Sequence, residues 1–122
     1  MKEETYILFD NGTFEEISET IAKELETRNE SPFWKDKVVP FSEAILSALV
    51  PLRDNGILFN PQGKKETKLT PELFLEWGDF VSLKTLAFTL QKSNEAHELL
   101  RTKLSPELCQ TYKEVELKLL GD

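Results

Sequence analysis

The residues that most often carry out chemistry in proteins are scarce in this chain. His97 is the only histidine and Cys109 the only cysteine, and twelve residues separate them on two predicted helices. A zinc site needs three or four protein ligands, and a reactive thiolate needs a base or a positive charge beside it. We therefore predict no metal site, and we interpret His97 as a surface or boundary residue and Cys109 as part of the packed core.

A nucleotide-binding site is excluded by spacing. A P-loop has four residues between its two glycines and a serine or threonine after its lysine. In this chain six residues separate Gly56 from Gly63, and Lys65 follows Lys64 where the hydroxyl should stand. We therefore predict that this chain is not an ATPase and holds no cofactor.

Acidic residues are concentrated at the N-terminal end. Residues 1–30 hold nine acidic and three basic residues, a net charge of −6, and the whole chain carries −7. Such an end repels the phosphates of nucleic acids and attracts basic protein surfaces, although it could also be only a solvated face that keeps the chain soluble. Adjacent carboxylates such as Glu15 and Glu16 lie on an exposed helix face, where they lack the desolvated setting that acid catalysis needs. We predict no catalytic residue and no direct nucleic-acid binding.

Length and composition favour one soluble globular domain. The 122 residues are 39% hydrophobic and 30% charged, which suits a single domain with one core. No apolar run approaches the ~18 residues of a membrane span, and acidic residues stand where a signal peptide needs basic ones. A lone cysteine suits a reducing compartment, so we expect a cytoplasmic protein without membrane contact.

The pattern of apolar residues and turn signals predicts an all-α fold. We expect about six helices in a compact domain over residues 13–122, preceded by an extension over residues 1–12. The segment TYILF, residues 5–9, is β-prone and ends at Asp-Asn-Gly, which predicts a short strand. A proline-containing turn sequence in residues 57–69 predicts a small hairpin or an ordered loop.

Helix-start signals precede each predicted helix. Thr13 and Glu16 have the spacing of a capping box, in which each side chain accepts a hydrogen bond from the other residue's amide. Serine or threonine followed by proline is a second such signal. Further start residues are Ser31, Thr70, Asp79 or Ser82, Asn94 and Ser105.

The longest predicted helix spans residues 33–54 and contains two prolines. Its apolar residues alternate in steps of four and three and so lie on one side of a helix. An interior proline costs about 3 kcal/mol, which burial of this side can offset. We expect a continuous, kinked helix, with a break at Pro40 as the alternative. The side predicted to be buried consists of Trp34, Val38, Phe41, Ile45, Ala48 and Leu52.

Candidate partner-binding residues come from the acidic helix and from two aromatics. We interpret most aromatic residues as core anchors; if any is exposed, we expect it to be Phe33 or Phe59, because neither lies on an apolar side. Acidic residues follow the outer side of the helix that starts at Thr13. The predicted set is Glu15, Glu16, Glu19, Glu26, Glu30, Phe33 and Phe59.

The sequence NESPFWKDKVVPFSEAILSALVPLRDNG, residues 29–56, resembles part of the all-α domain of type IV coupling proteins. These are the TraD/TraG-like ATPases of conjugation and type IV secretion, here in the longer form of IncI-type or Dot/Icm-like systems. The resemblance extends over roughly residues 13–92, from GTFEEISETIAKEL to the segment LFNPQGKKETKLTPELFLEWGDFVSLKTLAFTL. Pro40 departs from the family, where this helix is usually uninterrupted. Walker motifs are absent, so the resemblance implies an excised domain of a larger ATPase.

The resemblance implies that the domain receives transport substrates at the cytoplasmic face of the inner membrane. Its expected partners are a secreted protein substrate, a relaxase or an adaptor protein, and the rest of the motor. Basic C-terminal secretion signals would suit the acidic helix. The alternative is a free-standing small acidic adaptor or secretion chaperone. An inserted domain would bring its chain ends together, whereas an adaptor would show a two-fold apolar interface.

Overall fold

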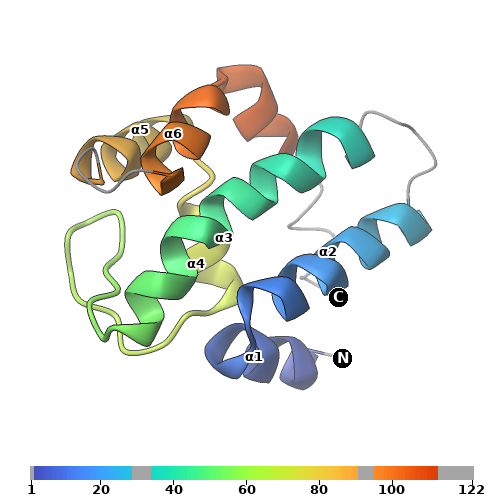
Figure 1. Ribbon diagram of the computed structural model, residues 1–122, viewed down its shortest axis with the longest axis horizontal. Helices are drawn as coiled ribbons and strands as arrows, with labels where there is room; N and C mark the ends of the chain where they lie inside the picture. Colours follow the sequence, from blue (N-terminus) through green and yellow to red (C-terminus); the bar gives the residue numbers. More distant parts are fainter. Residues whose placement is uncertain (1, 29–33, 91–94, 113–122) are drawn as a thin grey trace.

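The computed structural model contains helices and no strand in the part of the chain that it describes, which confirms the all-α class. Several helices pack against one long helix, which lies at the front of the molecule in Figure 1. Within the described ranges, no helix has both the length and the apolar character needed to cross a membrane. The backbone is described for residues 2–28, 34–90 and 95–112, and the side chains for residues 3–23, 36–90 and 97–112.

The long helix, α3 (Val39–Asp54), runs diagonally across the molecule in Figure 1. Helix α2 (Phe14–Arg28) packs along one side of α3, and α1 (Lys2–Asn11) lies at one end of the molecule, against α2. Residues 2–28 are therefore a pair of helices joined by a short turn.

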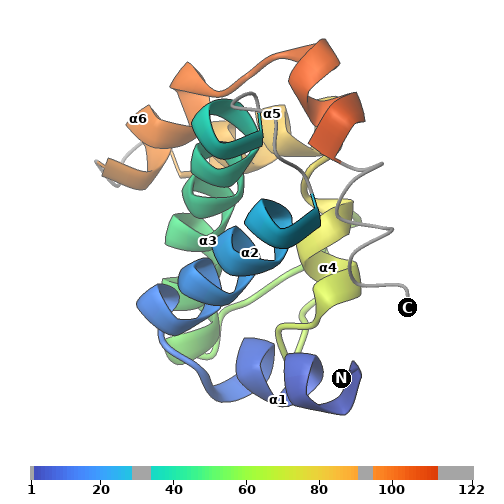
Figure 2. The ribbon, with the colours of Figure 1, turned by 90° about the vertical axis from the view of Figure 1, so that its right-hand side faces the viewer.

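Helices α4 and α6 pack against further sides of α3. Helix α4 (Pro71–Glu76) contacts both α1 and α3. Helices α5 (Phe80–Thr89) and α6 (Glu95–Thr102) pack on each other at the end opposite α1, as Figure 2 shows from the side. Helical winding begins again at residue 106 and continues to residue 112.

The predicted N-terminal strand is wrong, because residues 5–9 belong to α1. Helical winding turns Phe9 into the core, where its ring lies 5.4 Å from a phenylalanine ring of α4. The Tyr6 hydroxyl donates a hydrogen bond to the carboxylate of Glu72 at the start of α4. Arg53 of α3 donates to the Phe9 carbonyl over 2.8 Å, which satisfies one of the carbonyls left unpaired at a helix end. These tertiary contacts outweigh the β-propensity of the segment.

Helical winding continues through Pro40, as predicted. A π-helix, η1 (Trp34–Val38), leads directly into α3. Proline lacks an amide hydrogen, and its ring would collide with the carbonyl four residues earlier. A π-turn spaces its hydrogen bonds five residues apart, so the preceding turn accommodates Pro40 without a break.

The predicted buried side of the long helix is confirmed wherever its side chains are described: Val38, Phe41, Ile45, Ala48 and Leu52 are buried. The side chain of Trp34 lies outside the described residues. The structure also buries apolar residues that flank this side of α3, which the prediction left open. The remaining side stays partly or fully exposed at Glu43, Ser47 and Pro51, so neighbouring helices cover most of α3 but not all of it.

The end of α3 and the following loop agree with the turn signals. The Gly56 amide donates to the Arg53 carbonyl over 3.1 Å and the Ile57 amide to the Leu52 carbonyl over 3.0 Å. With Gly56 at φ +69°, these are the bonds of a Schellman cap. Residues 57–69 then form a hairpin-like loop closed by one antiparallel bridge between residues 59 and 65.

Candidate protein-binding surfaces

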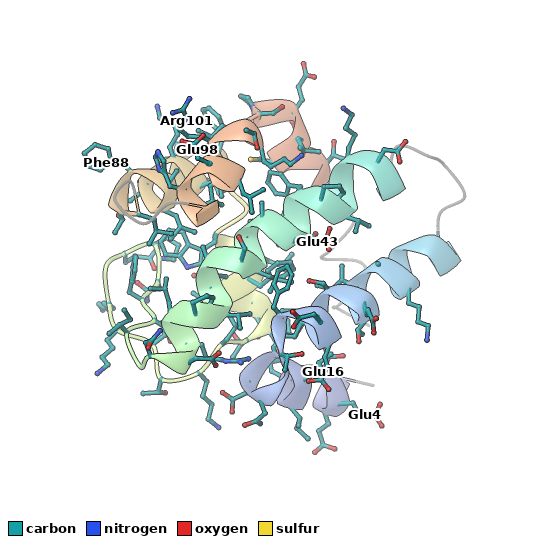
Figure 3. All side chains as sticks on the ribbon, in the orientation of Figure 1. Glu4, Glu16, Glu43, Phe88, Glu98 and Arg101 are labelled. Carbon is teal, nitrogen blue, oxygen red and sulfur yellow. The ribbon has the colours of Figure 1, made fainter. Side chains whose placement is uncertain are left out.

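Exposed carboxylates of α1 and α2 gather at one end of the molecule. Figure 3 shows Glu4 of α1 and Glu16 of α2 at this end. None of the carboxylates at this end forms an ion pair with a described residue. We call this region the acidic surface; it consists of Glu3, Glu4, Glu15, Glu16 and Glu19, all exposed.

Local sequence and core packing together orient the α2 part of this surface. The capping box is present as predicted: the Thr13 amide donates to the Glu16 carboxylate over 2.9 Å, and the Glu16 amide to the Thr13 hydroxyl over 3.1 Å. Ile17 is buried against the core, which sets the rotation of the helix about its axis. Glu15 and Glu19, one turn apart, therefore point into water.

The positive ends of two helices support this concentration of charge. Two of the acidic residues lie in the first turn of α1 and two in the first turn of α2, where the helix dipole favours negative side chains. Exposed carboxylates keep their hydration and lack the desolvated setting of a general acid. The arrangement can attract a basic group by charge.

The other predicted partner-binding residues divide into two groups. Glu26 lies within α2, but its side chain is outside the described residues, as are Glu30 and Phe33 altogether. Phe59 is not the exposed aromatic that we expected. Its half-buried ring meets the Trp77 ring edge-on at 5.4 Å, and its carbonyl accepts a hydrogen bond from Trp77 Nε1 over 3.2 Å. The loop folds Phe59 inward because Trp77, eighteen residues later, is buried beneath it.

His97 and Cys109 differ in burial and in the contacts that they make. Cys109 is buried, which confirms its prediction as a core residue. His97 is half-buried, with Nδ1 2.7 Å from the carbonyl oxygen of Ala87, and so links α6 to α5. Across the described part of the chain, no group of three potential metal ligands is found.

Sequence reasoning missed exposed apolar side chains on α5 and α6. Val81 and Phe88 of α5 are 69% and 70% exposed, and Leu99 of α6 is 44% exposed. Phe88 lies on the same side of the molecule as Glu98 and Arg101, whose charged atoms are 3.7 Å apart (Figure 3). The signal was present, because a spacing of seven places Val81 and Phe88 on one side of a helix.

No protein-family model, curated protein or solved structure matches this chain.

Proposed function

We propose that this chain is a protein-binding domain that receives a basic segment of a partner protein at the acidic surface. The observation that carries this proposal is the group of five exposed carboxylates on two adjoining helices, none ion-paired with a described residue. The proposed activity is recognition, without catalysis or a cofactor.

The resemblance to type IV coupling proteins narrows the proposed partner. In this reading the chain is the substrate-receiving all-α domain of a coupling protein, on the cytoplasmic face of the inner membrane. Its partner is the basic signal of a secreted protein, a relaxase or an adaptor, and the rest of the motor adjoins it. Nucleic acid is not a direct partner, because the acidic surface repels phosphates.

Because the acidic surface is exposed to solvent, the affinity of the complex should depend on the number of ion pairs and on the salt concentration. An exposed ion pair contributes about 0.2–1 kcal/mol, so several pairs are needed for useful affinity. The Debye length falls from about 30 Å at 0.01 M salt to about 8 Å at 0.15 M. Binding should therefore be fast and should weaken steeply over this range of salt.

A charge-reversal experiment tests the surface directly. The probe is a short fluorescent peptide in which lysine and arginine alternate with alanine, and its binding is followed by fluorescence anisotropy. We expect Glu15→Lys with Glu19→Lys to weaken binding about tenfold or more at low salt, because two attractions become repulsions. The matched control is Glu76→Lys with Glu107→Lys, two exposed acids elsewhere that give the same net charge. If both pairs lose affinity equally, net charge and not the acidic surface attracts the peptide.

The coupling-protein assignment needs a biological partner. The wild-type domain, used as bait, should retain a relaxase or a secreted effector of a type IV system, and the Glu15→Lys, Glu19→Lys variant should not. Binding of the basic peptide without any such partner would support the surface and count against the family.

The exposed apolar side chains of α5 and α6 favour the alternative, a free-standing acidic adaptor or secretion chaperone that dimerises through a helix face. Exposed apolar patches often mark interfaces. A dimer in sedimentation equilibrium that is lost on Phe88→Asp would support this alternative. The expected closeness of the chain ends rests on residues 1 and 113–122, which lie outside the described residues.

A further inference from the structure

The loop of residues 57–69 carries a cluster of lysines that the proposed function does not use. Lys64, Lys65 and Lys68 are exposed, and none makes an ion pair with a described residue. Ile57, at the start of the same loop, is 59% exposed. We call residues 57–69 the lysine loop. It joins positive charge to an accessible apolar side chain on a protein whose net charge is −7.

The side chain of Asn60 organises the tip of the lysine loop. Its oxygen accepts hydrogen bonds from the amides of Gln62 and Lys64, each over 3.0 Å. Its nitrogen donates to the carboxylate of Glu66 over 2.8 Å. The one acidic side chain within the loop is thus half-buried and bound to Asn60, and it forms no ion pair with a lysine.

The lysine loop is also anchored to the core. Leu58 and Leu69, near its two ends, are buried, and Trp77 holds Phe59 by a hydrogen bond and a ring contact. Gly63 adopts φ +83° at the turn, a conformation that glycine tolerates without strain. A loop that is already ordered loses little conformational entropy when a partner binds.

We propose that the lysine loop is a docking surface for an acidic segment of a second partner protein. Charge complementarity selects an acidic ligand, and exposed Ile57 offers the apolar contact that protein interfaces use. A nucleic acid fits less well. The loop contains no arginine, and Phe59 packs inward and offers no stacking platform for bases. The net charge of −7 also repels a long polyanion.

The position of the loop extends the proposed function. In Figure 1 the lysine loop and α2 lie on opposite sides of α3. One molecule can therefore hold a basic partner at the acidic surface and an acidic partner at the lysine loop. The protein would then bridge two partners of opposite charge.

The test uses the full chain and a short fluorescent peptide in which glutamate alternates with leucine. Three proteins are compared by anisotropy at low salt. They are the wild type, a loop variant with the three substitutions Lys64→Gln, Lys65→Gln and Lys68→Gln, and a control variant with the three substitutions Lys37→Gln, Lys84→Gln and Arg101→Gln. The control removes the same net charge from exposed sites outside the loop. Because each exposed ion pair is worth roughly 1.4- to 5-fold, we expect the loop variant to bind about 3- to 100-fold more weakly. We expect the control to change affinity less than about twofold.

Three results would overturn the proposal. One is no binding of the acidic peptide by the wild type at low salt, and another is an equal loss in both variants. The third is tighter binding of a labelled single-stranded oligonucleotide than of the acidic peptide, when binding of the oligonucleotide depends on the loop lysines to the same degree. The basic peptide separates this proposal from the proposed function, because its binding should survive the loop substitutions and disappear on charge reversal at Glu15 and Glu19. Thermal unfolding followed by circular dichroism checks that each variant is folded.

Discussion

Gly78 lies where α4 meets α5, and the ring of Tyr112 packs directly against it. A Cβ atom added at Gly78 would lie 2.0 Å from Cε2 and 2.4 Å from Cδ2 of Tyr112. Carbon atoms in contact are normally about 3.5–4 Å apart. Gly78→Ala would therefore force the ring to retreat by roughly 1.5 Å.

The cost of this displacement can be worked out from the contacts of Tyr112. The ring is fully buried, and its centroid lies 4.8 Å from that of Phe41 and 5.4 Å from that of Phe74. Its hydroxyl donates to the Phe74 carbonyl over 3.2 Å. Overpacking of this kind costs about 1–3 kcal/mol, and a lost hydrogen bond costs about 1 kcal/mol. Replacing glycine restricts the unfolded chain and returns about 0.4–1 kcal/mol. We expect Gly78→Ala to lower the free energy of unfolding by about 1–3 kcal/mol.

A double-mutant cycle isolates the clash. Urea unfolding, followed by tryptophan fluorescence and circular dichroism, is measured for the wild type, Gly78→Ala, Tyr112→Ala and the double variant. Tyr112→Ala alone should cost about 3–5 kcal/mol. With the ring absent, Gly78→Ala should cost nothing or stabilise slightly. An equal cost of Gly78→Ala in both backgrounds would refute the clash and point to the backbone at residue 78.

Two further predictions concern single hydroxyl groups. Ser42→Ala should raise the free energy of unfolding by about 1–2 kcal/mol, because the Ser42 hydroxyl is buried and has no hydrogen-bond partner among the described residues, and such burial costs about 1–3 kcal/mol. Urea unfolding measures this, with Ser47→Ala as the control, since the Ser47 hydroxyl donates to a carbonyl over 2.6 Å; no gain over the control would contradict it. The hydrogen bond to Glu72, then burial and the charge of Glu72, raise the pKa of Tyr6 above its ordinary value of 10.0. The resulting stabilisation is present below pH 10 and is lost as the pH rises through the pKa of Tyr6 in the folded protein. Over that pH range the free energy of unfolding should therefore fall more for the wild type than for Tyr6→Phe. Parallel curves of unfolding free energy against pH for the two proteins would disprove this.

Helix starts were the most predictable feature of the fold. Thr70 accepts a hydrogen bond from the Leu73 amide over 3.2 Å, and Ser105 accepts one from the Leu108 amide over 3.2 Å. Asp79, and not Ser82, caps α5. A cap involves residues only three positions apart, so its chemistry is written in the local sequence.

Side-chain exposure was harder to predict where two segments distant in sequence meet. Exposure of Glu15 and Glu19 followed from the periodicity of α2, because the buried side of one amphipathic helix determines its outer side. For Phe59 the position depends on Trp77, and for Phe88 on how α5 and α6 pack. The contact between Phe59 and Trp77 joins residues eighteen positions apart and leaves no trace in the neighbouring sequence, whereas the spacing of Val81 and Phe88 was visible there.

The sequence by itself determined that the chain is helical, where most helices begin, and that its acidity lies on the first long amphipathic helix. These features depend on periodicity, capping and composition, which act over a few residues. Only the tertiary structure decided that residues 5–9 are helical and that the lysine loop is anchored to the core. Both outcomes depend on partners far away in the chain, Glu72 and Arg53 for α1 and Trp77 for the loop, and local propensity yields to such contacts once they bury surface and satisfy polar groups.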